Sequence, residues 1–145
     1  MGTFLLVEGE DNEICIHHWC PEWRMEIEAG NDYGFVVSGR TRYEQRFVEG
    51  GDEMGNRFRQ FLRLDIPFKE KGKWKAVLWN ETFLNADDTD WGQRAGIDQV
   101  RNFAGLGIPV TSNFNIEAGY LNQLVNRPGD NLVNHAFSTY FNVRF

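Results

Sequence analysis

Four side chains that can bind a metal ion lie close together near the start of the sequence: Cys15, His17, His18 and Cys20. Thiolate and imidazole groups are common ligands of zinc and copper, so this cluster is a candidate metal site. Its spacing matches no structural zinc pattern, however, and no second pair of ligands follows. We therefore expect no metal and no other cofactor. The preferred interpretation is a disulfide in an oxidising compartment, or two thiols without a structural role.

A second candidate for metal binding is the acidic run formed by Asp87, Asp88 and Asp90. Carboxylates are the ligands that hard divalent cations such as calcium prefer. The run lacks the glycine and the distal glutamate of a calcium-binding loop. We interpret it as a solvent-exposed acidic loop, with a bound cation as the alternative.

His135 is the candidate general base of the C-terminal segment. The nearby hydroxyl of Ser138 falls on the opposite face of the strand predicted here, because side chains alternate along a strand. A nucleophile and base pair is therefore not formed locally. A lipase or acyltransferase that depends on His135 remains an alternative to a protein without enzymatic activity.

Arginine and acidic residues recur on one face of the predicted strands. A solvated face would carry more lysine, whereas an enclosed, mutually neutralising network favours the planar, multiply donating guanidinium of arginine. We therefore predict an inward-facing polar network, with an ordinary solvated sheet face as the alternative. Its members are Arg40, Arg42, Glu44, Arg46, Arg57, Arg59, Arg63, Asp65, Arg94, Asp98, Glu117 and Arg144.

The overall composition excludes two classes of protein. A net charge of -6 argues against a nucleic-acid partner, which needs a basic surface to bind phosphates. No apolar run approaches the roughly 18 residues of a transmembrane helix. Aromatic residues make up 14% of the chain, yet its mean hydropathy is -0.49, a combination that suits sheets with one apolar and one polar face.

The alternation of apolar and polar residues predicts an all-β protein without helices. Turn-forming residues separate the predicted strands at hairpin spacing, which favours an antiparallel up-and-down meander. The expected fold is a transmembrane-type β-barrel of about eight strands. Whether this chain forms the complete barrel or only part of it is left open by the sequence. The predicted strands span residues 3–8, 24–29, 35–48, 57–66, 74–85, 93–107, 114–126 and 131–145.

Several segments together resemble a family of uncharacterised outer-membrane barrel-like proteins of Gram-negative bacteria, the domain-of-unknown-function 2490 family. The resemblance covers about residues 35–145, which we treat as the barrel domain, whereas residues 1–34 match poorly. Family members carry a signal peptide and further strands in that region, so the chain looks truncated. The segments that carry the resemblance are Gly39–Phe47, Arg57–Leu64, Asn85–Gly92, Asp98–Gly107, Glu117–Gln123 and Asn134–His135.

The last residues are similar to the terminal assembly signal of outer-membrane barrels, which the barrel insertion machinery recognises. Phe141, Val143 and Phe145 carry this similarity. The resemblance implies that the last strand descends to the periplasm. Connections 49–55, 86–92 and 127–130 then face the outside, and connections 68–73 and 109–113 face the periplasm.

The resemblance implies a location rather than a reaction. We expect a non-enzymatic protein of the bacterial outer membrane, structural or envelope-associated, with membrane lipid and lipopolysaccharide as partners. The acidic run 87–90 would meet lipopolysaccharide through bridging cations. A soluble barrel that binds an apolar ligand is the alternative from another class.

Overall fold

The computed structural model describes residues 6–8, 13–19, 22–29, 33–68 and 74–143, and the side chains of residues 34–68 and 74–143. The described residues form one sheet of nine strands and contain no helix. Among them there is therefore no helix long and apolar enough to cross a membrane. The strands are β1 (Leu6–Glu8), β2 (Glu13–Trp19), β3 (Glu22–Ala29), β4 (Tyr33–Val48), β5 (Gly55–Pro67), β6 (Lys75–Asn85), β7 (Gly96–Pro109), β8 (Phe114–Val125) and β9 (Leu132–Val143).

Strands β4 to β9 form an antiparallel meander in which each strand pairs with the next along the chain. Ahead of the meander, β2 pairs with the C-terminal part of β4 and β3 with its N-terminal part, while β1 pairs with β2. The predicted all-β antiparallel meander is confirmed. The sheet is not closed into a barrel within the described residues.

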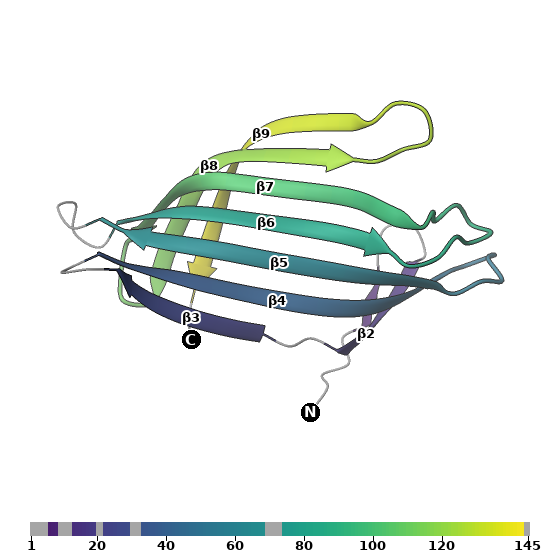
Figure 1. The fold of residues 1–145 in the computed structure, drawn as a ribbon, viewed down its shortest axis with the longest axis horizontal. Helices are drawn as coiled ribbons and strands as arrows, with labels where there is room; N and C mark the ends of the chain where they lie inside the picture. Colours follow the sequence, from purple (N-terminus) through teal and green to yellow (C-terminus); the bar gives the residue numbers. More distant parts are fainter. Residues whose placement is uncertain (1–5, 9–12, 20–21, 30–32, 69–73, 144–145) are drawn as a thin grey trace.

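The sheet is strongly curved, and β8 and β9 bend round behind the other strands (Figure 1). Gly105 of β7 and Gly119 of β8 are register partners. A Cβ atom on Gly105 would overlap the carbonyl of Ala118, and one on Gly119 would overlap the carbonyl of Ala104. Since glycine alone permits so close an approach, this pair allows the bend between β7 and β8.

The alternation of side chains gives the sheet an inner and an outer face. The inner face is the concave one, because Arg63 of β5 contacts Glu117 of β8 across two intervening strands. Its buried residues are both apolar and charged: Val77, Phe83, Phe103, Glu44, Glu81 and Glu117. The outer face exposes large apolar side chains, among them Phe58, Leu62, Leu78, Phe137 and Phe141.

The N-terminal part of β7 differs from the prediction. The strand begins at Gly96 rather than at residue 93, and its register with β6 shifts beside Phe83. Phe83 pairs with Gln99 and Leu84 with Ile97, so Asp98 is the extra residue of a β-bulge. The bulge reverses the alternation of side chains between the two parts of β7.

Candidate functional site: the charged and aromatic interior

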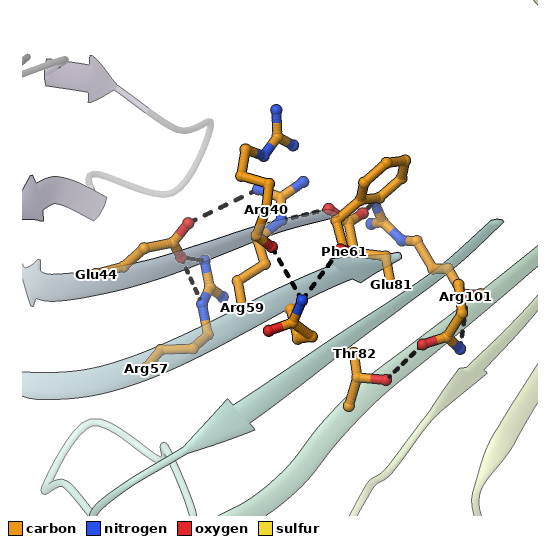
Figure 2. A network of polar contacts seen from close by, with 10 residues as sticks. Arg40, Glu44, Arg57, Arg59, Phe61, Glu81, Thr82 and Arg101 are labelled. Atoms are coloured by element: carbon orange, nitrogen blue, oxygen red, sulfur yellow. Dashed lines mark hydrogen bonds and ion pairs between the residues drawn. The ribbon is translucent and has the colours of Figure 1, made fainter. Parts of the chain in front are cut away.

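The first cluster of charges on the inner face joins strands β4 to β7 near connections 49–54 and 86–95 (Figure 2). The carboxylate of Glu44 accepts a hydrogen bond from Arg57 Nε at 2.7 Å. Arg59 Nε donates to Glu81 Oε1 at 2.6 Å, and its Nη1 lies 3.7 Å from Glu44 Oε1. Arg101 adds a further contact of 3.7 Å to Glu81. We call Glu44, Arg57, Arg59, Glu81 and Arg101 the upper ion cluster.

The ring of Phe83 lies within the upper ion cluster. The guanidinium carbons of Arg57, Arg59 and Arg101 lie 5.3, 4.8 and 5.1 Å from its centroid. Cations over an aromatic face are attracted to its negative centre, and the attraction grows where water is excluded. Phe83 is only 5% exposed. The buried ring of Phe83 thus fills the space between the three guanidinium groups.

Four aromatic rings pack next to this cluster on the inner face. Trp79 stacks on Phe103 with 5.3 Å between ring centroids and contacts Phe61 at 5.8 Å. Tyr140 of β9 meets both Phe103 and Trp79 edge-on, at 5.4 and 6.1 Å. Because Trp79 and Tyr140 come from β6 and β9, the rings span the curved sheet. We call Phe61, Trp79, Phe103 and Tyr140 the aromatic layer.

A second cluster of charges lies toward connections 68–74 and 110–113. Arg63 Nη2 lies 2.9 Å from Asp65 Oδ1, and Arg63 Nη1 donates to Glu117 Oε2 at 2.9 Å. Lys75 Nζ lies 3.3 Å from Asp65 and 3.9 Å from Glu117. We call Arg63, Asp65, Lys75 and Glu117 the lower ion cluster. Two cations thus face two carboxylates, so the cluster is neutral overall.

A polar cavity of about 780 Å³ adjoins the lower ion cluster. Arg63, Asp65, Lys75 and Glu117 line it together with residues of connection 110–113, such as Ser112. All four charged groups are already paired with one another. The cavity therefore offers polar contacts rather than a free charge for a ligand.

The acidic run belongs to a contact between two connections. Asp90 accepts hydrogen bonds from the backbone amides of Asp52, at 2.9 Å, and Glu53, at 3.3 Å. Trp91 Nε1 donates to the Glu53 carbonyl at 2.8 Å. Asp87 accepts from the Asn56 amide at 2.8 Å. We call this contact between connections 49–54 and 86–95 the loop clasp.

Asp88 and Asp90 are exposed, as expected for a solvated acidic loop, and the loop clasp shows in addition what their carboxylates contact. The carboxylates of Asp87, Asp88 and Asp90 accept from backbone amides, with Asp88 Oδ1 2.8 Å from the Ala95 amide. No group of metal-ligating side chains is present among the described residues. Gln93 extends the clasp, because its Nε2 donates to Asp87 at 2.7 Å and its Oε1 accepts from Arg46 at 3.3 Å.

His135 lies on the outer face of β9, and its Nδ1 makes a hydrogen bond with the hydroxyl of Tyr120. The two rings stack with 5.9 Å between centroids. Asn122 Nδ2 lies 3.5 Å from the same nitrogen. His135 and Ser138 stand at positions of opposite parity in β9, so the serine points to the inner face.

The remaining predicted residues occupy the following places. Arg40, Arg42 and Arg46 follow the inner-face alternation of β4, with Arg40 5.5 Å over the Phe61 ring and Arg46 5.3 Å over the Trp91 ring. Phe141 and Val143 lie on the outer face, 67% and 53% exposed. Arg144, Phe145 and Cys20 lie outside the described residues. The backbone of Cys15, His17 and His18 belongs to β2, and their side chains are also outside the description.

Two residues of the predicted polar network are placed elsewhere. Arg94 is exposed in the connection that precedes β7, because that strand begins only at Gly96. Asp98 is the bulged residue. Arg101, which the prediction omitted, joins Glu81 in the upper ion cluster. The sequence signal that could have found it is Gly96, two residues before the bulged Asp98, because a glycine within a strand often marks a bulge.

A curved antiparallel sheet with paired charges and stacked rings on its inner face, and large apolar side chains on its outer face, defines an all-β protein with a charged interior. The chain belongs to the family described as "Protein of unknown function (DUF2490)", which matches residues 8–134. The expected family membership is confirmed, and the match also extends N-terminal of residue 35.

A relative in Methylorubrum extorquens, named only as an uncharacterized protein, is 42% identical over 120 residues. The match covers 81% of this chain and 53% of the relative. The chain therefore spans about half the length of the curated relative that it matches. Neither name states an activity.

Proposed function

We propose that this chain is part of a β-barrel of the bacterial outer membrane, without enzymatic activity and with a structural or envelope-associated role. The observation that carries the proposal is the polarity of the two faces. Glu44 on the inner face is 1% exposed, whereas Phe137 on the outer face is 79% exposed. A sheet in water buries its apolar face, but a sheet in lipid presents that face to the hydrocarbon.

The filled interior favours structural support over transport. The ion clusters and the aromatic layer occupy the inner face where a channel would run, and the polar cavity beside the lower ion cluster is lined by charges that are already paired. In an eight-stranded barrel, side chains fill the interior and leave little room for a solute. The same charges argue against a soluble barrel that binds an apolar ligand, because such a ligand needs an apolar inner face.

An outer-membrane barrel of this kind would have three partners. Membrane lipid would cover the outer face, and the barrel insertion machinery would recognise the last strand through Phe141 and Val143, with Phe145 beyond the described residues. Lipopolysaccharide would meet the connections that carry the loop clasp. The clasp carboxylates already accept backbone hydrogen bonds, so this contact would use their remaining lone pairs through a bridging cation.

One substitution on the outer face tests the membrane proposal directly. Leu78 of β6 is 41% exposed and lies on that face. If lipid covers it, Leu78→Arg should destabilise the protein folded in bilayers by about 2–4 kcal/mol. On a water-exposed surface the change should stay within about 0.5 kcal/mol. Detergent-dependent solubility and heat-modifiable migration on a gel are the accompanying measurements, and solubility in plain buffer with native sheet content would overturn the proposal.

The contact between Tyr120 and His135 favours a lipid-modifying enzyme as the second candidate, because it places a possible base on the face that would meet lipid. The test is phospholipid hydrolysis by folded protein, with His135→Ala as the variant and Ser138→Ala as the matched control. Hydrolysis that His135→Ala abolishes would replace the non-enzymatic proposal. Absence of hydrolysis would remove the enzyme from consideration.

A further inference from the structure

A row of polar side chains crosses the outer face of β6 to β9, whose other residues are mostly apolar. Asn80 pairs in register with Asn102, Asn102 with Asn122, and Asn122 with His135. The row thus runs over four neighbouring strands, β6 to β9. The next row toward connections 68–74 and 110–113 contains Leu78, Ala104, Tyr120 and Phe137. We call Asn80, Asn102, Asn122 and His135 the outer polar row.

The hydrogen bonds of the outer polar row leave two complementary groups at its centre. Asn80 Nδ2 donates to Asn102 Oδ1 at 2.8 Å, and Asn122 Nδ2 lies 3.5 Å from His135 Nδ1. Within the described part of the chain, Asn102 Nδ2 and Asn122 Oδ1 make no hydrogen bond. One is a donor and the other an acceptor, on directly opposed residues of β7 and β8.

A hollow of about 430 Å³ lies beside this centre. Leu62, Leu78, Asn102, Ala104 and Tyr120 are among its lining residues. Ala104 has the smallest side chain of these five, and its register partner Tyr120 is 49% exposed. A small residue therefore faces a large protruding one across the same pair of strands that carries the two amides.

We propose that the outer face of β6 to β9 binds a second copy of this chain about a two-fold axis that runs along the face between β7 and β8. Such an axis exchanges β7 with β8, so Asn102 would donate to Asn122 of the partner subunit. It would also bring the partner's Tyr120 to the hollow at Ala104. A two-fold interface requires a self-complementary surface, and this face has one both in hydrogen bonding and in shape.

The hydrocarbon environment gives the contact its driving force, so the inference rests on the proposed function. Lipid offers no hydrogen bonds to the amides of the outer polar row, and polar side chains in a bilayer therefore promote association. Apolar side chains alone would gain little from leaving lipid for each other. Water around a soluble chain would satisfy the same amides and remove this preference.

The test uses two differently tagged chains, produced together in the membrane and carrying Cys15→Ser and Cys20→Ser. One chain carries Asn102→Cys and the other Asn122→Cys. We expect a cross-linked pair that bears both tags after oxidation. Phe58→Cys combined with Asn122→Cys is the control, because Phe58 of β5 is 42% exposed on the same face but does not line the hollow and lies beyond the proposed contact. Equal cross-linking of the control would show random collision and overturn the dimer.

A second measurement separates the dimer from the barrel itself. A variant with Asn102→Leu and Asn122→Leu should keep heat-modifiable migration, because neither amide contributes to the interior. Its dimer should dissociate about tenfold more readily in detergent, measured by analytical ultracentrifugation. Unchanged dissociation, or a monomeric parent protein that folds normally in the membrane, would overturn the dimer and leave the proposed function intact. A chain that folds in plain buffer would overturn both.

Discussion

Arg63 and Glu117 join strands β5 and β8, with 2.9 Å between Arg63 Nη1 and Glu117 Oε2. Strands β6 and β7 lie between them in the sheet. The ion pair therefore exists only when the sheet is curved. It joins two residues that are far apart along the chain across the inner face. Strand pairing alone would not require this curvature.

Removing the carboxylate of this pair should destabilise the folded protein. Glu117 is 4% exposed, and Glu117→Gln leaves Arg63 with Asp65 as its remaining carboxylate. We expect a loss of about 3 kcal/mol in the free energy of unfolding, because one charge stays buried with a weaker partner. Urea unfolding in detergent measures it. The matched control is Asp130→Asn in an exposed connection, and an equal loss in both variants would contradict the role of the pair.

Adding a side chain to the pair Gly105 and Gly119 should destabilise the bend between β7 and β8. Gly119→Ala adds a methyl group that overlaps backbone atoms of Ala104 and Gly105. We expect destabilisation of about 1–3 kcal/mol or more, since backbone cannot move aside as easily as a side chain. Refolding yield and thermal unfolding measure it. Ala136→Val adds volume at an exposed position of β9 and should have little effect.

The loop clasp should depend on Asp90 and not on calcium. Asp90→Ala removes the acceptor of two backbone amides, so connection 49–54 should become more accessible to an endoprotease that cleaves after acidic residues. The expected loss in stability is about 1 kcal/mol, because the bonds are exposed. Addition of a chelator should leave the melting temperature of the parent protein unchanged. A fall with the chelator would restore the cation interpretation.

The last strand offers a test of membrane assembly. Phe141→Ser changes an outer-face residue that is 67% exposed, so the main packing that the fold loses is the stacking of its ring on Phe114, at 6.2 Å between centroids. We expect the variant to refold in detergent like the parent protein, but to accumulate in the outer membrane at several-fold lower levels. Asn142→Ser, on the inner face of the same strand, is the control. Equal accumulation of both variants would contradict an assembly role for Phe141.

The alternation of residues predicted most of the strands and most of the inner face, because a period of two is a local property. Strand β2 (Glu13–Trp19) was not predicted. Arg59 and Glu81 could be assigned to one face in this way, each from its own strand. Arg101 could not, because the bulge at Asp98 reverses the alternation within β7. One inserted residue changes the face of every residue on one side of it.

The contacts between distant segments were not predictable from the sequence. Asp90 and Glu53 form the loop clasp only because connections 49–54 and 86–95 meet at one end of the sheet. Trp79 and Tyr140 meet only because the sheet curves. Periodicity describes which residues share a face, but it contains no information about how far that face bends.

The two faces of the sheet also differ in how much sequence change they should tolerate over evolution. On the outer face, Leu62 or Leu78 needs only to be apolar, so many substitutions preserve its role. On the inner face, Arg59 must keep a matching carboxylate at Glu81, and a change at one position requires a change at the other. Divergence among relatives should therefore concentrate on the outer face, while inner positions change in pairs or remain fixed.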